Sequence, residues 1–108
     1  MAEPLFGVVV PGRPAMFDFR PVDSTKAVAV LEAPSTVPEI AFFLLASTPI
    51  PPGHGAILYY AVPPHFVDWV ILGSVSPLKP SAIFRTGFPN NEQLAGCTAV
   101  QLGVALEP

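Results

Sequence analysis

The prolines are the feature that most restricts how this chain can fold. Fifteen of its 108 residues are proline, well above the usual share of about 5%. They lie between short apolar runs instead of forming one tract. Because proline has no backbone N–H, it is excluded from helix interiors and central strand positions. The prolines therefore mark element boundaries, and no helix of ordinary length fits well between them.

The segments between the prolines have the length and residue types of β-strands. The clearest runs from Thr98 to Leu106, where Val100, Leu102 and Val104 alternate with smaller or polar residues and predict a half-buried strand. The apolar run 42–45 could instead form a buried helical turn, and the sequence leaves that alternative open. We expect seven strands, at 5–10, 27–33, 39–46, 56–62, 66–75, 81–86 and 98–106.

Seven short strands at intervals near ten residues are typical of a β-sandwich. We predict an all-β fold, an antiparallel and jelly-roll-like β-sandwich of about seven to eight strands, with residues 1–108 forming one domain. Segments 11–25 and 88–96 are expected to be the least regular. Tyr59 and Tyr60 should point to opposite faces of their strand, one toward the core and one outward.

The stretch from Trp69 to Arg85 reads as a strand, a short proline-bounded turn and a second strand, which predicts a hairpin. Period-two alternation places Val67, Trp69, Ile71 and Val75 on one apolar face of the first strand. We therefore expect the indole of Trp69 to pack in the core.

Charge is scarce, at 12% of residues compared with about 25% in an average domain. A surface so poor in charge favours contacts with partners. The five cations are scattered and form no basic stripe, so we expect neither a nucleic acid nor a membrane surface as a partner. The chain also shows neither a signal peptide at its start nor an apolar run near the roughly 20 residues of a membrane span. We expect a soluble, intracellular protein.

Candidate catalytic and metal-binding residues are few. His54 and His65 each lie in a turn, and Cys97 is the only cysteine, whereas a metal site needs several ligands at set spacing. No Gly-x-Ser-x-Gly motif and no obvious pair of carboxylates is present. Spacing alone leaves a triad assembled in space open. We expect no metal, no cofactor and no enzymatic activity.

Phe88 stands at the mouth of the most polar run of the chain. Two interpretations follow from that position. The ring could plug the end of the sandwich as part of the core, or it could be an exposed anchor for a partner, since aromatic anchors dominate interface energetics. The sequence does not decide between them.

Several segments, in the same order along the chain, resemble the N-terminal domain of the Hikeshi family, carriers of Hsp70 chaperones into the nucleus. The most specific is Lys79-Pro80-Ser81-Ala82-Ile83-Phe84-Arg85, and the others are Leu5-Phe6-Gly7, Gly12-Arg13, Phe43-Leu44-Leu45, the run 49–55, Tyr59-Tyr60 with Pro63, Trp69 with Leu72-Gly73, and 100–104.

The resemblance implies a non-enzymatic nuclear import carrier, active notably in heat stress and present in cytosol and nucleus. Its partners would be an Hsp70 chaperone and the Phe-Gly repeats of nucleoporins. A homodimer stays open, because the family's helical C-terminal domain contributes to dimerisation and we expect that domain to be absent. Leu94 stands nearest the exposed phenylalanine of the family's loop. The candidate partner-binding residues are Pro49, Pro51, Pro52, Gly53, Phe88 and Leu94.

A β-sandwich scaffold or small-ligand-binding module without a transport role is the alternative. It would require a pocket with convergent polar groups.

Overall fold

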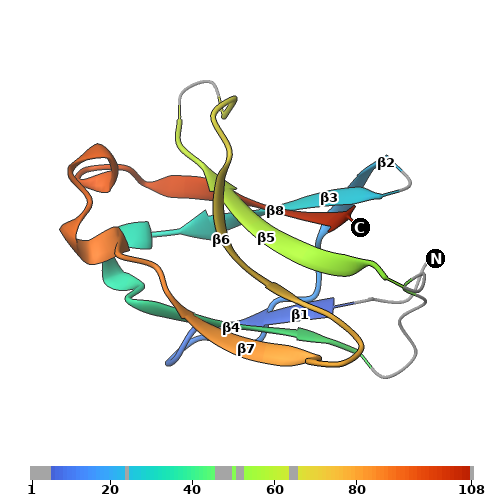
Figure 1. Cartoon of the computed structure of the whole chain (residues 1–108). Coiled ribbons are helices and arrows are strands. Elements are labelled where there is room, and N and C mark those ends of the chain that lie inside the picture. The colour runs from blue at the N-terminus through green and yellow to red at the C-terminus, as the bar shows by residue number, and fades with distance from the viewer. Residues whose placement is uncertain (1–5, 24, 46–49, 51–52, 64–65, 108) are drawn as a thin grey trace.

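The structure is a computed structural model, and it describes residues 6–23, 25–45, 50, 53–63 and 66–107. Eight strands lie in this part of the chain, all paired antiparallel, with no α-helix among the described residues (Figure 1). They are β1 (Phe6–Val9), β2 (Arg20–Asp23), β3 (Lys26–Glu32), β4 (Glu39–Leu44), β5 (Gly55–Ala61), β6 (Val70–Val75), β7 (Ser81–Arg85) and β8 (Ala99–Glu107).

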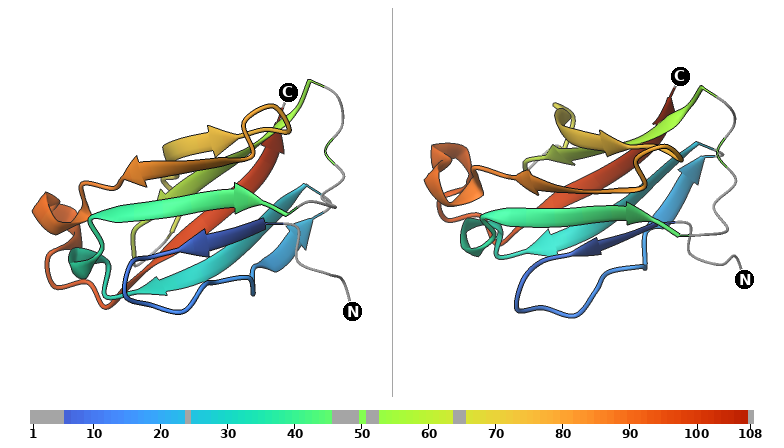
Figure 2. Two further views of the ribbon diagram at one scale, coloured as in Figure 1. Left: turned by 90° about the horizontal axis from the view of Figure 1, so that it is seen from below. Right: turned by 60° about the horizontal axis from the view of Figure 1, so that its bottom comes forward.

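The strands form two layers, which Figure 2 shows facing each other. One sheet has the order β1-β4-β7 and the other the order β2-β3-β8-β5-β6. The pairs β5–β6, β4–β7 and β3–β8 are nested in sequence, a pattern typical of jelly-roll-like sandwiches. The predicted all-β sandwich and its strand number are confirmed. The helical alternative for 42–45 was wrong, because β4 includes Phe42, Phe43 and Leu44.

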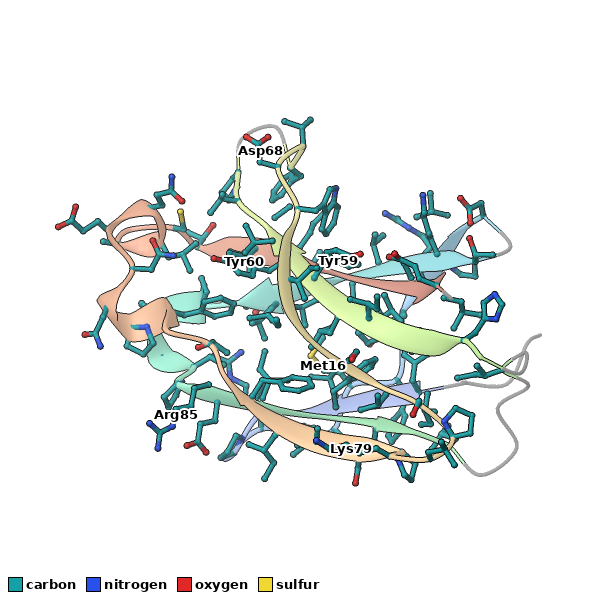
Figure 3. The ribbon with its side chains drawn as sticks, in the orientation of Figure 1. Met16, Tyr59, Tyr60, Asp68, Lys79 and Arg85 are labelled. Carbon is teal, nitrogen blue, oxygen red and sulfur yellow. The ribbon has the colours of Figure 1, made fainter. Side chains whose placement is uncertain are left out.

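The core lies between the two sheets and is built from the inward residues of both. Ile40 and Phe42 of β4 and Leu58, Val100 and Leu102 of the facing sheet are completely buried. No described residue of polar or charged type is buried. Figure 3 shows Met16 between the sheets, where it packs against this core. The alternation predicted for β8 is confirmed, because Val100, Leu102 and Val104 are all buried.

The segment 11–25, expected to be irregular, contains β2, which was missed. Pro21 lies within β2, at the outer edge of the five-stranded sheet. Edge positions tolerate proline because the outward N–H has no partner to lose. The other irregular segment, 88–96, holds two short 3₁₀ helices, η2 (Phe88–Asn90) and η3 (Glu92–Leu94).

The predicted hairpin from Trp69 to Arg85 was wrong. β6 pairs with β5 and β7 pairs with β4, so the two strands belong to different sheets. In Figure 1 the chain runs along β6, crosses to the other layer and continues as β7. An aromatic contact joins the two sheets. Phe84 of β7 packs on Gly73 of β6 so closely that a Cβ on Gly73 would not fit.

The predicted apolar face of 66–75 was also wrong. Leu58 pairs with Gly73 and Tyr59 pairs with Ile71, so the register shifts by one residue and leaves a β-bulge on β6. A bulge reverses the alternation of side chains beyond it. Val75 is consequently buried, whereas Ile71 is 61% exposed. Trp69 precedes the strand and is 39% exposed, so its indole is not in the core.

Candidate functional site

An apolar groove of about 470 Å³ lies on the outer face of the five-stranded sheet. Its floor is made by small residues of β8, Gly103 and Ala105. Tyr59 and Trp69 line it on the side of β5 and β6, and Val28 of β3 lines it on the other. We call this feature the Trp69 groove. Large side chains on both sides of a strip of small ones give it its depth.

The position of the indole depends on Gly103. A Cβ placed on that residue would come within 2.8 Å of Cζ3 of Trp69, closer than side chains pack. The six-membered ring of the indole therefore lies against backbone, while Trp69 as a whole stays 39% exposed. Aromatic side chains that are rigid and partly exposed are the usual anchors of protein interfaces.

Polar groups lie at the rim of the groove. The phenol of Tyr59 donates a short hydrogen bond to the carboxylate of Glu107, and Lys26 lines the opposite side. The hydrogen bond to Glu107, with a smaller effect of partial burial, raises the pKa of Tyr59 above its usual value. Tyr60, by contrast, packs edge-on against Phe88, with ring centroids 4.8 Å apart (both tyrosines are labelled in Figure 3). The prediction that the two tyrosines face opposite ways is confirmed.

The lining of the Trp69 groove is mostly apolar, with Lys26, Tyr59, Gln101 and Glu107 as its polar side chains. Its described lining includes no serine, cysteine or histidine that could act as a nucleophile or metal ligand. Across the described residues, no group of three or more His, Cys, Asp and Glu side chains could hold a metal ion. No described helix is long and apolar enough to cross a membrane.

The sequence profile of the Hikeshi-like N-terminal domain matches residues 9–108, which is nearly the whole chain. The chain belongs to the Hikeshi-like N-terminal domain family. The fission yeast Protein OPI10 homolog is 33% identical over 96% of this chain and 53% of its own length. Zebrafish Protein Hikeshi is 39% identical over 75% of this chain and 42% of its own length. The chain thus spans about half the length of the curated relatives it matches.

The segments that carry the Hikeshi-like resemblance include scaffold contacts. Gly73 and Phe84, from two of these segments, join the sheets. Arg13, from a third, donates to the backbone oxygen of Glu32 at 2.7 Å and to Oγ1 of Thr36 at 2.8 Å. These bonds fix the loop after β1 to the corner between β3 and β4. Such contacts hold the scaffold of this chain together and do not by themselves identify a binding surface.

Two of the residues singled out for partner binding lie inside the Hikeshi-like sandwich. Phe88 and Leu94 are both 0% exposed and belong to the core cluster. Thr86, two residues earlier, accepts from the backbone N–H of Phe88 at 3.1 Å and donates to the carbonyl of Val37 at 2.5 Å, which ties this backbone to the segment before β4. Burial favours the plug interpretation of Phe88, and neither side chain is a surface anchor in this structure.

The remaining candidates concern the loop before β5. Pro49, Pro51 and Pro52 lie outside the described residues. Gly53 is exposed, adopts a left-handed φ of 77°, and lines a second depression, of about 590 Å³, together with residues 54–55 and 74–79. Partner binding by this loop stays a prediction.

Sequence reasoning missed the Trp69 groove. The second face of the strand 98–106 carries Ala99, Gly103 and Ala105, small residues in a strand that proves to be central. Small residues on one face of a central strand leave room for something larger above it. The only tryptophan of the chain fills part of that room.

Proposed function

We propose that this domain is a non-enzymatic carrier module of nuclear import that binds Hsp70 chaperones and the Phe-Gly repeats of nucleoporins, notably in heat stress. The observation that carries the proposal is the family match over residues 9–108. The names of the zebrafish and human relatives, Protein Hikeshi, support it. The setting would be the cytosol and the nucleus.

The Trp69 groove is the surface we assign to the Phe-Gly repeats. Repeats of this kind are disordered, so each phenylalanine must dock alone and leave quickly. A trough of about 470 Å³, with small residues at its floor and two aromatic side chains, Tyr59 and Trp69, along one side, suits one such ring. Its open edge and the lack of a deep enclosure favour weak, fast exchange.

Peptide retention tests the repeat-binding part of the proposal. A Phe-Gly repeat peptide is immobilised, and the chain is passed over it beside a matched peptide in which serine replaces each phenylalanine. We expect retention on the first peptide alone. Equal retention on both would show that the surface is merely adhesive.

Hsp70 capture is tested separately, with the chain as bait and purified Hsp70 in the presence of ATP, of ADP or of neither. We expect ATP-dependent capture. If no Hsp70 binds in any nucleotide state, this chain does not hold a sufficient Hsp70 site. A homodimer is a separate prediction, and sedimentation across a range of protein concentrations tests it.

A small-ligand-binding module is the second candidate, and the same groove favours it. The pairing of Tyr59 with Glu107 beside an apolar trough provides convergent polar groups of the kind small-molecule sites use. A thermal-shift screen would reveal it as a ligand that raises Tm in the intact chain and has no effect in Trp69→Ala.

A further inference from the structure

The turn between β6 and β7 has no part in the proposed binding of Hsp70 or of Phe-Gly repeats. It reads Ser76-Pro77-Leu78-Lys79. Leu78 at its tip is 99% exposed. Two backbone hydrogen bonds close the turn, from Ser76 N–H to the Lys79 carbonyl at 3.0 Å and from Lys79 N–H to the Ser76 carbonyl at 2.9 Å.

We propose that Ser76 is a phosphorylation site for a proline-directed serine/threonine kinase of the cyclin-dependent class. Such kinases select proline directly after the target residue, because their site offers no hydrogen-bond acceptor for a backbone N–H at that position. They also select a lysine or arginine three positions after the target residue, which contacts an acidic patch on the kinase. Ser76 meets both requirements through Pro77 and Lys79. Charge patterns of this type set kinase specificity.

The chain contains one other Ser/Thr-Pro pair, Thr48-Pro49, and it serves as an internal comparison. Three positions after Thr48 stands Pro51 in place of a cation. A kinase of this class should therefore prefer Ser76. The comparison separates recognition of the full pattern from recognition of proline alone.

Opening this turn would involve few contacts outside it. Kinases bind their targets as extended chains, so the Ser76–Lys79 hydrogen bonds must break. The strands on either side do not pair with each other, since β6 belongs to one sheet and β7 to the other. Val75 is buried before the turn, and the carbonyl of Pro80 accepts from the N–H of Leu44 at 2.7 Å after it. Opening the turn therefore breaks the two Ser76–Lys79 bonds and moves the adjoining ends of β6 and β7 apart, but it does not require a ladder between β6 and β7 to break.

The transfer itself uses Mg-ATP as the phosphoryl donor. Oγ of Ser76 forms a bond to the γ-phosphorus, the bond from that phosphorus to the β,γ-bridging oxygen breaks, and ADP leaves. The hydroxyl proton passes to the catalytic base of the kinase. No electrons are exchanged with a redox partner.

The surroundings of Ser76 can accommodate the product. A phosphate adds about −1.5 to −2 charges at neutral pH. The described lining of the 590 Å³ depression beside Ser76 includes Lys79 and contains no aspartate or glutamate. The new charge therefore meets no like charge in that lining, and the fold should persist. Gly53 shares the depression, so the phosphate would alter the surface next to the loop before β5.

The test exposes the intact folded chain to a purified cyclin-dependent kinase and Mg-ATP and locates phosphate by peptide mass spectrometry. We expect phosphate on Ser76, its loss in Ser76→Ala, and a several-fold slower reaction in Lys79→Ala. Ser74→Ala, which lies on the same depression but precedes no proline, should react like the parent chain.

Absence of phosphate on Ser76, preferential modification of Thr48, or a rate unaffected by Lys79→Ala would each overturn the proposal. A synthetic peptide covering residues 70–85 is the positive control for the kinase. If the peptide reacts and the folded chain does not, the turn stays closed and the proposal is equally overturned. The outcome does not depend on whether the domain carries Hsp70.

Discussion

The indole of Trp69 rests on the backbone of Gly103, with room for no Cβ between them. The same relationship recurs between Phe84 and Gly73, but in the interior between the sheets. One pair forms the wall of an open groove and the other holds the two sheets together. Substituting Gly103 therefore tests a contact at the surface, and substituting Gly73 tests the equivalent contact between the sheets.

Gly103→Ala should displace the indole with little loss of stability, because Trp69 can swing into solvent. We expect a change in the free energy of unfolding within about 1 kcal/mol and a red shift of the fluorescence of this single tryptophan. Emission spectra and urea unfolding measure both. An unchanged spectrum would show that the ring does not rest on Gly103.

Gly73→Ala should be more harmful, since Phe84 packs against the core and would lose that contact if it were displaced. Overpacking of a core contact costs about 1–3 kcal/mol or more, so the urea midpoint should fall clearly below that of Gly103→Ala. If the two variants are equally stable, Phe84 does not join the sheets as described.

Phe88→Ala tests the plug interpretation. Loss of a fully buried phenylalanine costs about 3–5 kcal/mol, and here it also removes the edge contact to Tyr60. Chemical unfolding should show the loss directly. Normal stability together with weakened partner binding would instead restore the anchor interpretation.

Tyr59 makes a pH-dependent contribution to stability. Its pKa is raised above 10.0 in the folded state because the neutral phenol donates to Glu107. The stabilisation is therefore complete below the unfolded pKa and is lost as the pH rises through the folded one. Tyr59→Phe should lower the urea midpoint at neutral pH and lose this effect above pH 10.0.

Tyr60→Phe is the matched control for that experiment, because the hydrogen bond to Glu107 comes from Tyr59. A stability gap between the parent chain and Tyr59→Phe that stays constant or widens above pH 10.0 would contradict the assignment.

Much of the fold could be predicted because proline and alternation act locally. The runs that became β3, β4, β5, β7 and β8 are visible in sequence, since each side chain's face follows from period two. The sheet to which a strand belongs is not local information. β6 and β7 are adjacent in sequence, yet they pair with β5 and β4 because Phe84 and Gly73 fix the crossing.

The candidate site was harder to predict for the same reason. An isolated glycine such as Gly73 can mark a bulge, but it does not fix the register, and the bulge between Ile71 and Gly73 moved Ile71 outward. Burial of Phe88 and Leu94 depends on short 3₁₀ helices that close the end of the sandwich, which a polar run such as 90–93 does not predict. The Trp69 groove arises from residues on β3, β5 and β8 that only the five-stranded sheet brings together.

The most direct test of the central claim compares Trp69→Ala with Phe17→Ala for binding to a Phe-Gly repeat peptide. Phe17 is a matched control, since it is 40% exposed against 39% for Trp69 and lies over Gly7 on the outer face of the other sheet. We predict that Trp69→Ala raises Kd by about tenfold or more, while Phe17→Ala binds like the parent chain. Equal Kd values for the parent chain and Trp69→Ala, or a larger loss in Phe17→Ala, would contradict the assignment of the groove.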